Sequence, residues 1–77
     1  MLYKSEQMKV PHKLQKTIKE LYSHGDVAEI ARRYEFSRYR VSRVIDGEDD
    51  SDPDVIAAVA EFYTERKDTI SDYLIAE

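Results

Sequence analysis

The chain has 77 residues, a formal net charge of -4 and no cysteine. This length allows one domain with a modest core and little room for a deep substrate pocket. The missing thiols exclude disulfides, cysteine-zinc sites and thiol nucleophiles. No apolar run approaches the ~18 residues of a membrane span, and the N-terminus lacks an apolar stretch of signal-peptide length. We therefore expect a single domain over 1–77 that has no membrane partner and is cytoplasmic.

The composition favours an all-α fold without a catalytic or metal site. Gly and Pro occur only twice each, so few residues interrupt helices. The chain offers no Ser-His-Asp set, no Gly-rich phosphate loop and no isolated carboxylate pair in apolar surroundings, which argues against an enzyme. His12 and His24 are separated by a predicted helix and have no nearby ligand set. We expect no metal and no cofactor.

The first predicted helix covers 11–23 and follows a short extended or frayed arm over 1–10. Pro11 suits the first turn, where its missing N–H is not needed. Gly25 is predicted to cap the end of this helix in a left-handed conformation. The apolar residues that recur at helical spacing are Leu14, Ile18 and Leu21.

The next two predicted helices are short and adjacent. The second begins at Asp26, which forms a capping-box pattern with Glu29, and ends near Tyr34 or Glu35. The third covers 38–46, with Ser37 as its N-cap and Gly47 as its end. The inward side of the third helix is expected to carry Val41, Val44 and Ile45.

The C-terminal part, 53–77, is predicted to be one long helix or two helices joined near Asp68. Asp52 followed by Pro53 is a strong helix start, and no later Pro or Gly interrupts the chain. The apolar stripe of this helix is longer than the small core needs. Its later residues are therefore candidates for a homodimer contact or for packing back on the first helix. The candidate dimer residues are Phe62, Ile70, Tyr73 and Leu74.

Opposite charges are separated along the chain. Residues 1–45 hold ten Lys or Arg against five Asp or Glu, whereas 46–77 hold two against eleven. Five arginines lie within 32–43, and six acids follow within 45–54. A local basic field can attract nucleic acid even when the net charge is negative.

The segment ValAlaGluIleAlaArgArgTyrGluPheSerArgTyrArgValSerArgVal, 27–44, resembles the helix-turn-helix of bacterial and phage repressors. Its later part, 37–47, is similar to the recognition helix of lac-repressor-type regulators. The resemblance implies a compact four- to five-helix lambda-repressor-like domain with the motif at about 26–47. Glu35 stands where the family usually has a left-handed Gly. The residues matching the core of the motif are Val27, Ile30, Ala31, Phe36, Val41 and Val44.

Helical spacing places Tyr39, Ser42 and Arg43 opposite the inward valines, with Arg38 and Arg40 at the edges. An apolar inner face and a donor-rich outer face suit a helix in the major groove of double-stranded DNA. Arg43 is the candidate for guanine recognition and Arg40 for phosphate. The following acids are expected to face away from the duplex or lie at its margin, and a further hypothesis is that they limit non-specific phosphate binding and so sharpen selectivity. The predicted DNA-binding residues are Ser37, Arg38, Tyr39, Arg40, Ser42 and Arg43.

These features predict a transcriptional regulator, such as a phage or bacterial repressor, that binds two DNA half-sites as a homodimer. The alternative is a protein-interaction module, because the same arrangement of helices also serves assembly and the acidic C-terminal half could bind a basic protein partner. An antitoxin or excisionase-like accessory factor, which binds both DNA and a protein partner, is a third interpretation.

Overall fold

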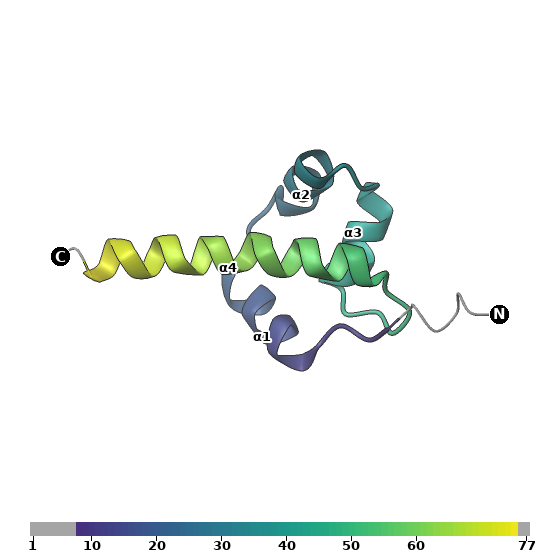
Figure 1. The fold of residues 1–77 in the computed structure, drawn as a ribbon, viewed down its shortest axis with the longest axis horizontal. Helices are drawn as coiled ribbons and strands as arrows, with labels where there is room; N and C mark the ends of the chain where they lie inside the picture. The colour runs from purple at the N-terminus through teal and green to yellow at the C-terminus, as the bar shows by residue number, and fades with distance from the viewer. Residues whose placement is uncertain (1–7, 76–77) are drawn as a thin grey trace.

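The computed structural model describes the backbone of residues 8–75 and the side chains of residues 8–70. Over this range the chain forms four α-helices, which confirms the predicted all-α class (Figure 1). They are α1 (His12–Leu21), α2 (Asp26–Tyr34), α3 (Arg38–Ile45) and α4 (Pro53–Ile75). Of the two alternatives for the C-terminal part, the structure has the single helix. None of the described helices is both long and apolar enough to cross a lipid bilayer.

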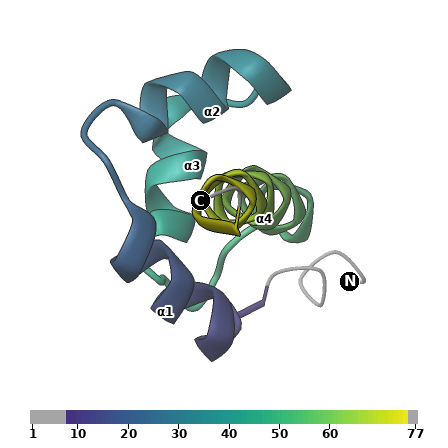
Figure 2. The ribbon, with the colours of Figure 1, turned by 90° about the vertical axis from the view of Figure 1, so that its left-hand side faces the viewer.

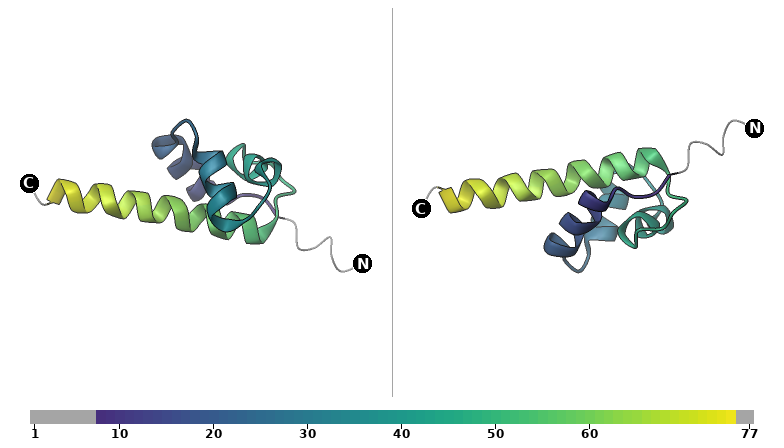
Figure 3. Two further views of the ribbon diagram at one scale, coloured as in Figure 1. Left: turned by 90° about the horizontal axis from the view of Figure 1, so that it is seen from above. Right: turned by 90° about the horizontal axis from the view of Figure 1, so that it is seen from below.

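The long helix α4 is the support on which the other three helices pack. Seen along its axis, α4 has α1, α2 and α3 gathered on one side (Figure 2). The three short helices cover its first half, and its C-terminal part projects beyond them (Figure 3). At ~1.5 Å per residue, the 23 residues of α4 span roughly 35 Å. The helix is therefore long enough both to close the core and to extend past it.

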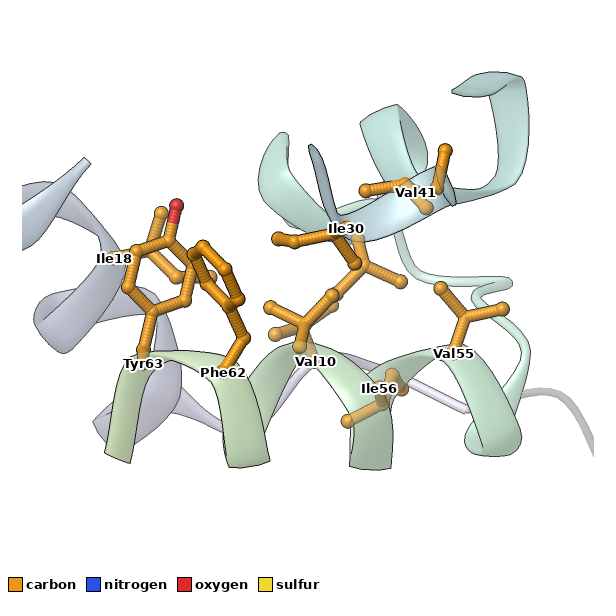
Figure 4. Close-up of a cluster of buried hydrophobic side chains, with 11 residues drawn as sticks. Val10, Ile18, Ile30, Val41, Val55, Ile56, Phe62 and Tyr63 are labelled. Atoms are coloured by element: carbon orange, nitrogen blue, oxygen red, sulfur yellow. The ribbon is translucent and has the colours of Figure 1, made fainter. Parts of the chain in front are cut away.

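The core lies between α4 and the short helices. Val41 of α3 faces Val55 of α4, while Phe62 and Tyr63 lie beside Ile18 of α1 (Figure 4). The rings of Phe62 and Tyr63 meet edge to face, with centroids 5.2 Å apart. Phe62 is only 5% exposed. The prediction that Phe62 is a dimer contact is therefore wrong, because the small core uses this ring itself.

Most predicted helix signals are confirmed. The Ser37 hydroxyl accepts a hydrogen bond from the Arg40 amide at 3.2 Å and so caps α3. Gly47, with φ 76°, lies just past the end of α3 in the left-handed region. The carboxylate of Asp52 accepts a hydrogen bond from the Asp54 amide at 2.9 Å at the start of α4. These signals act over a few residues, so the sequence suffices to find them.

Two signals between α1 and α2 were misassigned. The helix α1 ends at Leu21, and Gly25 takes its left-handed conformation, φ 96°, at the entry to α2 instead. Asp26 is the first residue of α2, after the N-cap Gly25, and its carboxylate accepts hydrogen bonds from Ser23, Tyr63 and Arg66 rather than from α2. The predicted capping box with Glu29 is wrong, because the Asp26 carboxylate turns into the protein interior, where it is 2% exposed.

Part of the predicted N-terminal arm belongs to the fold. Met8 and Ser51 exchange two backbone hydrogen bonds of 3.0 Å, which form an isolated antiparallel bridge. Val10 is 2% exposed and joins the hydrophobic core. The extended conformation was predicted, but a frayed arm is wrong for residues 8–10. Residues 1–7 lie outside the described part of the chain.

Candidate nucleic-acid interface

A tight turn sets the position of α3 against α2. Glu35, which stands where the resembled family usually has a left-handed Gly, ends α2 in the left-handed conformation, with φ 62° and ψ 42°. A non-Gly residue in this conformation costs about 1 kcal/mol. The Phe36 amide then donates a 3.0 Å hydrogen bond to the Ala31 carbonyl. Ala31 is 7% exposed, so its small side chain leaves space for the two helices to approach closely.

The helix α3 has the two faces that the spacing predicted. Val41 and Val44 are fully buried. On the other side Tyr39 is 69% exposed. The remaining predicted site residues lie on or beside this outer face, of which Ser37, Arg38 and Arg40 are exposed while Ser42 and Arg43 are half-buried. Of the predicted motif core, Ile30 and Ala31 are buried and Val27 and Phe36 are half-buried against them.

Two arginines of this face are already paired with acids of the same chain. Arg40 forms an ion pair with Asp52, and Arg43 forms one with Asp50. The Arg43 guanidinium also lies over the Tyr39 ring, 5.6 Å from its centroid, and donates a 3.3 Å hydrogen bond to the Tyr39 hydroxyl. Both guanidiniums are therefore held toward the loop that follows α3.

The loop 46–52 has a fixed position beside α3. Ser51 is 2% exposed, bridges to Met8 and donates from its hydroxyl to the Glu48 carbonyl at 2.9 Å. Burial alone raises the pKa of Asp52, but the amide of Asp54 and the side chain of Arg40 outweigh it. The pKa of Asp52 therefore lies below its ordinary value. The acids were expected to face away from a bound duplex or to lie at its margin, and this stays a prediction. The structure places Asp50 and Asp52 in contact with arginines of the outer face of α3.

The sequence did not indicate this pairing. Arg43 and Asp50 are seven residues apart and Arg40 and Asp52 are twelve apart, so neither pair has the spacing of three or four residues at which side chains of one helix contact each other. The segment 37–52 holds three arginines against five acids. The outer face of α3 therefore lies in a local field that is less positive than the arginine count alone suggests.

Two other arginines of this region lack the acidic partners that Arg40 and Arg43 have in the described part of the chain. Arg32 and Arg38 have no ion pair within residues 8–70, and with Phe36 they line a shallow groove between α2 and the start of α3. Arg33 instead pairs with Glu65 of α4 at 2.8 Å. The N-terminal edge of α3 thus carries the least compensated positive charge of this region.

A second polar cluster, which the sequence did not predict, lies inside the protein. Both Asp26 oxygens accept hydrogen bonds from Arg66, at 2.7 and 3.0 Å, and one oxygen also accepts from the Tyr63 hydroxyl at 2.8 Å. The Ser23 amide donates to the same carboxylate at 2.8 Å, and Arg66 donates to the Leu21 carbonyl at 3.0 Å. This cluster connects the α1–α2 loop to α4. The one available signal was Arg66 itself, which interrupts the apolar stripe of α4.

The acid–base properties of this buried cluster follow from its contacts. Burial raises the pKa of Asp26, but the hydrogen bonds from Arg66, Ser23 and Tyr63 outweigh burial, so its pKa lies below the ordinary value. Burial and the neighbouring Asp26 charge both raise the pKa of Tyr63. The cluster therefore holds an ionised carboxylate and a neutral phenol, and it serves the fold rather than an exposed site.

The other predicted dimer residues lie toward the projecting end of α4. Ile70 is 43% exposed. The side chains of Tyr73 and Leu74 lie outside the described part of the structure, although their backbone continues α4. Within residues 8–70, no group of three His, Asp or Glu side chains is arranged to hold a metal ion.

Comparisons of the chain with protein-family models, curated proteins and solved structures find no match.

Proposed function

We propose that this protein is a helix-turn-helix regulator that binds double-stranded DNA sequence-specifically by inserting α3 into the major groove. One observation carries the proposal. The left-handed turn at Glu35 joins α2 to a short helix whose valines are buried and whose opposite side presents arginines and an exposed tyrosine. A major groove about 12 Å wide accepts such a helix, and base edges offer the acceptors that arginine needs.

The proposed roles follow the position of each side chain on α3. Arg43 makes two hydrogen bonds to guanine O6 and N7, worth about 1–3 kcal/mol of discrimination. Tyr39, the most exposed of these residues, contacts a thymine methyl or a base edge. Arg38 and Ser37, at the N-terminal end of α3, reach the base edges and the DNA backbone. Arg40 binds a phosphate. Both Arg40 and Arg43 must exchange a carboxylate partner to do so.

The proposal includes a homodimer formed through the projecting end of α4. A single short helix rarely supplies the specific affinity of ~10⁻⁸ M or better that regulators need, whereas two copies can read two half-sites. Ile70 lies on this end, and α3 lies near the opposite end of α4, so the dimer contact and the DNA contact do not compete (Figure 1). Sedimentation at tens of micromolar tests this part, and a strictly monomeric protein would exclude it.

The experiment that tests the function is selection of bound duplexes from a random DNA library. The affinity for the most strongly selected duplex is then measured over a range of salt concentrations. We expect an enriched palindromic motif and an affinity that falls steeply with salt. The variant Arg43→Ala should relax base preference at one position. The matched variant Arg40→Ala should weaken binding to all sequences alike and reduce the salt slope by about one phosphate. Absence of any duplex binding at low salt would refute the proposal.

A second candidate function is binding of a protein partner. It is favoured by the ion pairs of Arg40 and Arg43, because the segment 37–52 then presents more acids than free arginines. A basic partner would bind this face, with or without DNA as in an antitoxin or accessory factor. Under this function neither arginine variant changes DNA binding, because none occurs.

A further inference from the structure

We propose that Asp50 makes the DNA binding more selective by competing with DNA phosphates for Arg43, and that Asp52 competes in the same way for Arg40 and so weakens binding to all duplexes. This inference rests on the proposed function and deepens it. The sequence led to the hypothesis that the loop acids limit non-specific phosphate binding, and the structure adds which carboxylates act and on which arginines. The two ion pairs, Arg43–Asp50 and Arg40–Asp52, are the observation that carries it.

The competing carboxylates are fixed in place by the fold. Ser51, which stands between them, is buried and forms the bridge with Met8 through two backbone hydrogen bonds. Asp52 is further held because its other oxygen caps α4 through the Asp54 amide. A carboxylate on an anchored loop remains beside its arginine when DNA approaches. The local concentration of this competitor therefore does not fall as the duplex binds.

The arginine side chains are positioned for an exchange of partners. The Arg43 side chain is 27% exposed and that of Arg40 is 46% exposed, so both remain accessible to solvent from one side. Arg43 lies along the exposed Tyr39 ring, and Arg40 lies over the Phe36 ring with 5.3 Å to its centroid. These rings keep each guanidinium beside the outer face of α3 while its anionic partner changes.

The competition acts differently on random and on matched DNA. At a random site each guanidinium exchanges one anion for another, and the phosphate also repels the displaced carboxylate, so the net gain is small. At a matched site Arg43 meets the neutral O6 and N7 acceptors of guanine, which do not repel Asp50 and which match the planar arginine fork. Asp50 thus weakens random binding more than matched binding, whereas Asp52, whose partner Arg40 contacts a phosphate in both cases, weakens both alike.

The chain offers a charge-matched control for this inference. Asp49 lies in the same loop, is exposed, and makes no ion pair within residues 8–70. Asn has nearly the shape of Asp, and it also caps helices well, so Asp52→Asn keeps the start of α4 intact. Asp49→Asn, Asp50→Asn and Asp52→Asn each remove one negative charge from the loop. Only the last two remove a competitor for an arginine.

The experiment measures the affinity of the four proteins, wild type included, for a random duplex and for the best selected duplex over a range of salt. Circular dichroism first establishes that each variant is folded. We expect Asp50→Asn and Asp52→Asn each to bind the random duplex about two- to fivefold more tightly than Asp49→Asn does. Their random-duplex salt slopes should steepen by about one phosphate, or ~0.9. The ratio of matched to random affinity should fall for Asp50→Asn only, because Arg40, the partner of Asp52, contacts a phosphate in matched and random duplexes alike.

Each outcome separates the inference from the proposed function. If the wild type selects a motif but Asp50→Asn and Asp52→Asn behave like Asp49→Asn, the inference is wrong and the function stands. If the wild type selects no motif while these two variants bind random duplex with a steeper salt slope, the function fails and the competition stands. If none of the four proteins binds any duplex at low salt, both are refuted.

Discussion

Two regions of this molecule use the same pair of residue types, arginine and aspartate, in opposite ways. Beside α3, Arg40 and Arg43 each meet one carboxylate at the surface. Between α2 and α4, Arg66 holds both oxygens of Asp26, whose side chain is 3% exposed. The surface pairs have water and other anions as alternative partners, whereas the buried pair does not. Burial therefore separates charges that can be exchanged from charges that maintain the fold.

The difference in energy between the two regions is large. An exposed ion pair contributes about 0–1 kcal/mol, because water solvates both charges almost as well as they solvate each other. Removing one member of a buried pair costs about 3–5 kcal/mol, because the remaining charge has no replacement partner. Arg66 keeps some exposure, with 26% of its side chain accessible, so the lower end of that range applies to Asp26. The three predictions that follow test this contrast in order of expected effect.

The largest effect is expected for removal of the buried carboxylate. We predict that Asp26→Ala lowers the free energy of unfolding by about 3 kcal/mol, since Arg66 and the Tyr63 hydroxyl lose their shared acceptor. The matched surface change, Asp50→Ala, should lower it by less than about 1 kcal/mol. Urea unfolding followed by circular dichroism measures both. If both variants lost the same free energy of unfolding, burial would not explain the difference between the two regions.

The second effect is a pH dependence. The pKa of Asp26 is lowered in the folded protein, so its contribution to stability is complete above the unfolded pKa of ~3.9 and is lost as pH falls through the lower folded pKa. The stability difference between the wild type and Asp26→Asn should therefore narrow as the pH falls from 7 through 4 and below. Urea unfolding at several pH values measures this difference, with Asp49→Asn as the surface control. A difference that stays constant to pH 3 would contradict an ionised Asp26.

The smallest effect separates two tyrosine hydroxyls. Tyr63 is fully buried and donates to Asp26, whereas Tyr39 is exposed and accepts from Arg43. We predict that Tyr63→Phe lowers the free energy of unfolding by about 1–2 kcal/mol and that Tyr39→Phe leaves it within ~0.5 kcal/mol. Thermal unfolding of both variants decides this, and a loss for Tyr39→Phe as large as that for Tyr63→Phe would refute the contrast.

Much of the fold was predictable because its signals are local. The apolar spacing and the N-caps Ser37 and Asp52 located α3 and the start of α4, and the inward position of Val41 and Val44 is confirmed. The resemblance of 27–44 to repressor motifs marked Glu35 as a departure at a position where the family usually has a left-handed Gly, and the structure has Glu35 in that conformation. The residues of the outer face of α3 were also identified, since one helical period suffices to place them. Their binding to DNA stays a prediction.

The errors share one physical cause. Asp26 was predicted to cap α2, and Phe62 was predicted to face a second copy, from patterns that do fit those roles locally. Each residue instead serves contacts with partners far along the chain. Val10 was missed for the same reason, because a segment without helical periodicity gives no local indication that it enters the core.

Helix limits and the two faces of α3 follow from interactions over about one helical turn, so the amino-acid sequence alone determined them. The sequence did not determine which partner each charged residue takes. Arg66 and Asp26 are 40 residues apart, and the loop whose acids pair with Arg40 and Arg43 is itself bridged to the distant Met8. Ion pairing depends on distance and on exclusion of water, and both exist only once the helices have packed.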